Sequence, residues 1–184
     1  MRIVGGKFRG KALQSPEDAG IRPTADRVRE AVFNILASRL GPHLEGRWVL
    51  DLFAGTGALG LEALSRGAAG VVFVDTGAEA RGLIRDHIEA FGAGGTAKLL
   101  RRDATDLGPA GTLGPFDLIF LDPPYGKGLG ERALSSARAG GWIAPDATIV
   151  LEESRDTVLD LPPGFVLDDR REYGAAAVHF LHLG

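Results

Sequence analysis

Residues 116–125 read Phe116-Asp117-Leu118-Ile119-Phe120-Leu121-Asp122-Pro123-Pro124-Tyr125, an apolar run that ends in two prolines. Five of the first six residues are apolar, which is typical of a buried strand in a parallel sheet. Each proline fixes φ and has no backbone N–H to donate, so the turn after the strand is rigid. Open α/β sheets bind ligands at the carboxyl ends of their strands. This stretch therefore predicts both a fold class and the place of a site.

The turn presents an acidic side chain, Asp122, beside the carbonyls of Pro123 and Pro124 and the ring of Tyr125. Hydrogen-bond acceptors next to a stacking surface suit a planar amine, such as the exocyclic NH2 of a nucleobase. A strand that simply ends in a Pro-Pro turn with a packing tyrosine explains these four residues equally well. The rest of the chain has to decide between the two interpretations.

On both sides of this stretch, apolar runs alternate with helical patterns. This alternation predicts an α/β fold with a mostly parallel, doubly wound sheet, and the last two strands predict a hairpin-like end. A further helix is expected to start near Thr24 or Asp26, either of which can cap it, and to end at Leu40. We expect strands at residues 48–53, 71–75, 97–101, 116–121, 147–152, 165–167 and 177–181, and helices at residues 58–66, 78–91 and 130–139.

A glycine-rich loop follows the first of these strands. Residues 55–60, Gly-Thr-Gly-Ala-Leu-Gly, match G-x-G-x-x-G, and Asp75 ends the next strand, so a nicotinamide-dependent oxidoreductase has to be considered. Asp51 argues against that class, because a carboxylate beside the loop would repel a pyrophosphate. The same carboxylate suits a cationic amine. S-adenosylmethionine carries such an amine, with a ribose for Asp75 and an adenine amine for Asp103.

Composition indicates one globular domain. The chain has 184 residues, of which 45% are hydrophobic and 24% charged. It has no cysteine, and its four histidines are scattered, so we expect no metal site. No apolar run is long enough to cross a bilayer and no secretory leader is visible, so we expect a cytoplasmic monomer that does not bind membranes.

Positive charge is concentrated at the N-terminus. Residues 1–39 hold eight basic and four acidic side chains, a net charge of +4. Because the whole chain has a net charge of −3, residues 40–184 carry a net charge of −7. A basic segment on an acidic body predicts a polyanion contact in one region, although an ordinary solvated face is the alternative. Residues 2–13 suggest a β-hairpin with Phe8 available for stacking. The candidates for phosphate contact are Lys7, Arg9, Lys11, Arg22 and Lys127.

At these motifs the chain resembles the class I S-adenosylmethionine-dependent methyltransferases, and residues 122–125 resemble the branch that methylates exocyclic amines. Residues 2–10, 22–30 and 51–63 are similar to the RsmD family, bacterial enzymes that methylate N2 of one guanine in small-subunit (16S) ribosomal RNA. The resemblance implies a Rossmann-like, seven-stranded, mostly parallel sheet with an antiparallel C-terminal hairpin. It also implies an RNA-contacting β-hairpin extension at residues 1–21 and a single methyltransferase domain at residues 22–184.

The resemblance further implies a set of site residues. Asp122, Pro123, Pro124 and Tyr125 are expected to be catalytic, and Tyr125 stands where that family commonly has Phe. The substrate is expected to be 16S ribosomal RNA within the small subunit or an assembly intermediate, bound by Tyr125 and the basic candidates above. The expected S-adenosylmethionine contacts are Thr24, Asp51, Phe53, Ala54, Gly55, Gly57, Asp75, Asp103, Ala104 and Asp122.

Three alternatives stay open on the sequence alone. The first is another methyltransferase, since relatives with a motif similar to residues 122–125 methylate adenine N6 or other exocyclic amines of nucleic acids, or a protein glutamine. The other two are the nicotinamide-dependent oxidoreductase and a non-catalytic RNA-binding module. Binding of S-adenosylmethionine, of a nicotinamide nucleotide, or of neither separates the three classes.

Overall fold

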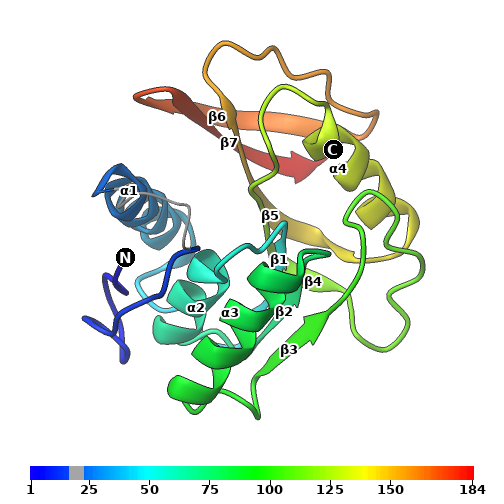
Figure 1. Ribbon diagram of the computed structural model, residues 1–184. Coiled ribbons are helices and arrows are strands. Elements are labelled where there is room, and N and C mark those ends of the chain that lie inside the picture. The colour runs from blue at the N-terminus through cyan, green and yellow to red at the C-terminus, as the bar shows by residue number, and fades with distance from the viewer. Residues whose placement is uncertain (17–22) are drawn as a thin grey trace.

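The computed structural model describes residues 1–16 and 23–184, with the side chains of residues 23 and 24 outside that description. It is an α/β structure in which helices flank a twisted sheet (Figure 1). In chain order the elements are α1 (Pro23–Leu40), β1 (Trp48–Leu52), α2 (Ala58–Ser65), β2 (Gly70–Val74), α3 (Ala78–Ala90), β3 (Ala97–Leu100), β4 (Phe116–Leu121), α4 (Leu129–Ala139), β5 (Ile143–Ser154), β6 (Phe165–Tyr173) and β7 (Ala176–Leu183).

The sheet has seven strands in the order β3-β2-β1-β4-β5-β7-β6. The strands from β3 to β5 are parallel, and β7 and β6 form the antiparallel C-terminal hairpin. The predicted fold class is therefore confirmed. The direction of winding reverses between β1 and β4, and a crevice for a ligand opens at such a switch point.

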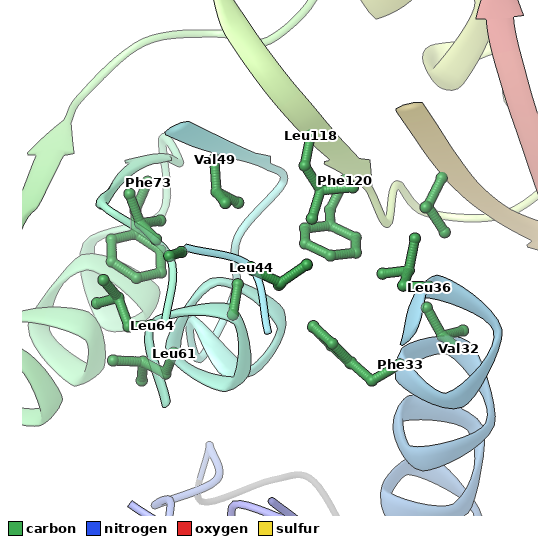
Figure 2. Close-up of a cluster of buried hydrophobic side chains, with 14 of the residues drawn as sticks. Val32, Phe33, Leu36, Leu44, Val49, Leu61, Leu64, Phe73, Leu118 and Phe120 are labelled. Atoms are coloured by element: carbon green, nitrogen blue, oxygen red, sulfur yellow. The ribbon is translucent and has the colours of Figure 1, made fainter. Parts of the chain in front are cut away.

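Two hydrophobic cores lie on opposite faces of the sheet because side chains alternate along each strand. The first core packs α1, α2 and α3 on one face, and Figure 2 shows part of it, with Phe33 of α1, Leu61 of α2 and Phe120 of β4. The second packs α4 on the other face and includes Leu134 and Trp142. Helices on both faces explain why the central strands read as continuous apolar runs.

The last three strands, β5, β6 and β7, extend beyond their predicted ends. β5 begins at Ile143 and β6 runs to Tyr173, through a charged stretch that the sequence pattern assigns to a connection. β6 lies at the edge of the sheet, where charged side chains can remain in water. Within β6, Arg170 pairs with Glu172 at 2.6 Å, so the strand tolerates charge that a central strand could not.

The predicted N-terminal hairpin takes a reduced form. Within residues 1–16 the chain folds back on itself, but only one antiparallel bridge forms, between Arg2 and Ala12. Ile3 and Leu13 are buried in the core with α1 and α2. At Gly6 (φ +80°) a Cβ atom would lie 2.0 Å from the carbonyl oxygen of Ser65, so this turn docks on α2 only with glycine there.

Within residues 1–16 and 23–184, no helix is both long and apolar enough to cross a membrane.

Candidate active site

Acidic side chains gather where four neighbouring parallel strands end. Asp51 lies in β1, Asp75 directly follows β2, Asp122 directly follows β4, and Glu152 is near the end of β5. These strands are adjacent in the sheet, in the order β2-β1-β4-β5. The carboxyl edge of the sheet therefore carries a row of carboxylates across the switch point.

Strand register places Asp122 and Glu152 side by side. Leu121 pairs with Leu151 between β4 and β5, and both belong to the core on the α4 face. Successive side chains point to opposite faces of a strand. Asp122 and Glu152 therefore both turn toward the face covered by α1, α2 and α3, and both line the same cavity.

This cavity has a volume of about 360 Å³ and lies between the strand ends, the glycine loop, α1 and the N-terminal segment. Its walls include Val28, Arg29 and Val32 of α1 and residues 15–16 of the segment before it. Five of the predicted cofactor residues contribute to its lining, namely Asp51, Phe53, Ala54, Gly55 and Asp122.

The glycine loop is tightly held against the sheet. At Gly60 a Cβ atom would lie 2.4 Å from the ring of Phe73, so a larger residue would push α2 away from β2. Phe53 has φ 55°, a left-handed conformation that is uncommon outside glycine and is often found at functional sites. The buried ring of His87 contacts the loop through Nδ1, 2.8 Å from the carbonyl oxygen of Thr56. Its Nε2 accepts a hydrogen bond from the N–H of Gln14, which ties the N-terminal segment to the loop.

Asp51 is almost fully buried at the floor of the cavity. Its Oδ2 accepts a hydrogen bond from the N–H of Gly60 at 3.0 Å. Burial raises the pKa of Asp51 to about 8, and the charge of Asp75 adds to the effect while the Gly60 N–H opposes it. A carboxyl group of this kind is largely protonated at neutral pH and ionises when a cation binds beside it.

The acids after β2 and β3 are engaged locally. Asp75 accepts hydrogen bonds from the N–H of Gly55 at 2.9 Å and of Gly77 at 2.8 Å, so it braces the glycine loop. Asp103 accepts from the hydroxyl and the N–H of Thr105, which lower its pKa. Asp75, Asp103, Ala104 and Gly57 do not appear among the residues lining the cavity, and their predicted cofactor contacts stay predictions.

The Pro-Pro turn is anchored from both ends. The N–H of Asp122 donates to the carbonyl oxygen of Leu52 at 3.4 Å, and the N–H of Gly126 donates to Glu153 at 2.9 Å. Tyr125 keeps 43% of its surface exposed and hydrogen-bonds to Glu152. Burial and the neighbouring carboxylates raise the pKa of Tyr125, so its phenol stays protonated and can donate that bond.

Comparison with known proteins identifies the family. A protein-family model described as "Conserved hypothetical protein 95" matches residues 1–182. The ribosomal RNA small subunit methyltransferase D of Escherichia coli (strain K12) is 37% identical over 163 residues, which cover 89% of this chain and 79% of that protein. The chain belongs to the ribosomal RNA small subunit methyltransferase D family.

Further family members agree. The Haemophilus influenzae ribosomal RNA small subunit methyltransferase D is 34% identical over 169 residues, which cover 91% of this chain and 86% of that protein. The solved structure of yhhF from Escherichia coli has a TM-score of 0.83 at 34% identity, with 100% of this chain and 97% of that chain covered. The chain is thus an enzyme of the methyltransferase class, as the sequence motifs predict.

The basic candidates for phosphate contact differ in how the structure places them. Lys7, Arg9 and Lys11 are exposed, and Lys127 is exposed in the loop after Tyr125. Phe8 differs from the prediction: it packs against Phe91 with ring centroids 5.0 Å apart, so it is partly buried instead of presented for stacking. Two of the candidates lie outside what the structure describes, namely Arg22 and the side chain of Thr24.

The sequence analysis does not identify two residues of the candidate site. Glu152 and Glu153 lie at the end of β5, where Glu152 lines the cavity and Glu153 is buried beneath the Pro-Pro turn. The sequence does contain a sign of their position, because acidic residues also stand at the ends of the other parallel strands. Within the described residues, no group of three or more potential ligands is arranged to hold a metal ion.

Proposed function

We propose that this methyltransferase transfers the methyl group of S-adenosylmethionine to the exocyclic N2 amine of a guanine in 16S ribosomal RNA. The observation that carries the proposal is one cavity that joins Asp51 and the glycine loop to Asp122 of the Pro-Pro turn. The residues proposed to bind the cofactor and those proposed to accept the hydrogens of the amine therefore lie around the same cavity. The names of the relatives support ribosomal RNA of the small subunit as the substrate.

The charge of the cavity suits the proposed cofactor. Asp122 and Glu152 line it, and Asp51 adds a carboxyl group that ionises when a cation binds beside it. Arg29 is the basic residue among its described lining. The guanidinium of Arg29 is already engaged by Glu62 at 3.1 Å and by Asp26 at 3.0 Å. An excess of negative charge attracts a ligand with a sulfonium and an ammonium group and repels a pyrophosphate. This distribution favours S-adenosylmethionine over a nicotinamide dinucleotide.

In the proposed reaction, bound S-adenosylmethionine supplies a methyl group on a positively charged sulfur. Asp122 and the Pro123 carbonyl accept the two N–H groups of the guanine amine. They orient its lone pair and stabilise the positive charge that develops on nitrogen. The exposed ring of Tyr125 stacks on the base after it leaves the RNA stack.

The N-terminal segment is proposed to bind the phosphates around the target. Lys7 and Lys11 each lie over the ring of Phe8, at 5.0 and 5.1 Å from its centroid. Their placement over one aromatic side chain keeps two positive charges on the same exposed surface. The RNA-contacting extension at residues 1–21 remains a proposal, and its described part, residues 1–16, is packed onto the body of the enzyme.

The test is methyl transfer from labelled S-adenosylmethionine to small ribosomal subunits from cells that lack this protein, with naked 16S ribosomal RNA in parallel. The product is digested and its nucleosides are identified. N2-methylguanosine supports the proposal, and the two substrates show whether assembly matters. Label on N6 of adenine would keep the methyl transfer and reject guanine. No label in either RNA, despite measured cofactor binding, rejects ribosomal RNA as the substrate.

A further inference from the structure

We propose that Glu152 determines the specificity for guanine by accepting the N1–H of the target base, an inference that rests on the proposed function. Glu152 lines the cavity together with Asp122 and follows Leu151, the register partner of Leu121. The two carboxylates therefore stand at the ends of adjacent parallel strands and turn to the same face of the sheet.

The chemistry of the base explains why a second acceptor belongs there. On the Watson–Crick edge of guanine, the N2 amine is flanked by N1–H, a second donor. On adenine, the amine is flanked by N1 with a lone pair and no hydrogen. When Asp122 holds the N2 amine, the next donor along the edge is N1–H, and a carboxylate on the neighbouring strand can accept it. The same carboxylate repels the N1 lone pair of adenine.

Glu152 has acceptor capacity to spare for this role. Among the described residues, Tyr125 donates a hydrogen bond to the Glu152 side chain. A carboxylate has about four acceptor positions, so further donors can bind. Glu153 is different, because it is 1% exposed and accepts hydrogen bonds from the N–H groups of Gly126 and Ser154. Glu153 holds the turn, while Glu152 faces the cavity beside the ring that stacks on the base.

The inference is tested with 2-aminopurine, which keeps an amine at C2 but has a lone pair at N1. Subunits are reconstituted with guanine or with 2-aminopurine at the nucleotide that the wild-type enzyme methylates. We expect the wild-type enzyme to prefer guanine by about tenfold or more. In Glu152→Gln the side-chain amide can donate to N1 of 2-aminopurine or accept N1–H of guanine, so the preference should largely disappear. Glu152→Ala should methylate the two substrates at similar, reduced rates.

Controls separate a specificity role from a structural one. Glutamine can still accept the Tyr125 hydrogen bond, and Tyr125→Phe removes that bond while keeping the carboxylate, so Tyr125→Phe should retain the guanine preference. Binding of S-adenosylmethionine by Glu152→Gln, measured by calorimetry, shows that the variant is folded. Unchanged guanine preference in both Glu152 variants overturns the inference, as does loss of transfer to both bases in both variants with intact cofactor binding. Absence of N2-methylguanosine from the wild-type reaction instead rejects the proposed function itself.

Discussion

Arg29 of α1 donates from Nε to the carboxylate of Glu62 in α2 at 3.1 Å, and both side chains are buried. The same carboxylate accepts hydrogen bonds from the N–H groups of Val4 and Gly5, each at 3.0 Å. It also accepts from Arg66 at 3.0 Å. One buried acid thus fastens α1 and the N-terminal segment to the helix that follows the glycine loop.

We expect Glu62→Gln to destabilise the protein by about 1.5–3 kcal/mol, because the buried guanidinium of Arg29 keeps Asp26 but loses the charge of Glu62. Urea unfolding followed by circular dichroism measures the loss. The matched control is Glu172→Gln, which breaks a solvent-accessible pair with Arg170 and should cost little stability. Equal losses in the two variants would contradict the structural role of Glu62.

The pKa of Asp51 leads to a prediction about the ligand-free protein. Because burial raises this pKa from 3.8 to about 8, the folded state holds a proton that the unfolded state releases. This group therefore favours folding most at low pH, and its contribution declines as pH rises from about 4 to about 8. Asp51→Asn should flatten that part of the stability curve, measured by urea unfolding across the range. An identical slope in wild type and variant would show that Asp51 titrates normally.

Cofactor binding should have the opposite pH dependence. A cationic amine binds the ionised form of Asp51, so affinity for S-adenosylmethionine should rise as pH increases from about 6 to about 8 and binding should release a proton. Calorimetry in buffers of different ionisation enthalpy measures both quantities. Asp51→Asn should bind more weakly at about pH 8 and lose the dependence. Undiminished affinity in that variant would count against the amine contact.

Asp122→Ala should separate catalysis from cofactor binding. We expect methyl transfer to fall by about 100-fold or more, because an acceptor that stabilises developing charge is removed. Affinity for S-adenosylmethionine should fall far less than the rate of transfer, as measured by calorimetry. Asp106→Ala, at an exposed position away from the cavity, serves as the control and should retain full activity. If Asp122→Ala bound the cofactor as weakly as it transferred methyl groups, Asp122 would have to be assigned to cofactor binding and not to the target base.

Neutralising Lys7, Arg9 and Lys11 to glutamine should weaken RNA binding and reduce its salt dependence. Each phosphate contact that is lost lowers the slope of log affinity against log salt by about 1. Binding titrations at several salt concentrations measure the slope, and cofactor affinity should not change. Lys98→Gln, at an exposed position of β3, is the control. A triple variant with the wild-type slope would show that these residues form an ordinary solvated surface and do not contact phosphates.

Local patterns in the sequence determined the elements and much of the site. Apolar runs and helical spacing predict the strands and helices because an element that is buried on one or both faces needs apolar residues at a regular local spacing. Asp51, Asp75 and Asp122 could be placed at one edge of the sheet because parallel strands present their carboxyl ends together. The charged part of β6 could not be recognised as strand, since its place at the edge of the sheet depends on the whole topology.

Only the tertiary structure decided which of these side chains share a cavity. Glu152 joins Asp122 through the register of β4 and β5, a pairing between residues distant in sequence. Phe8 packs on Phe91, so it is not presented for stacking as the sequence pattern predicts. Arg29 contributes to the basic charge of residues 1–39, but its guanidinium is buried against Glu62. The physical reason is that periodicity is a property of adjacent residues, whereas register, burial and ion pairing are set by packing between distant segments.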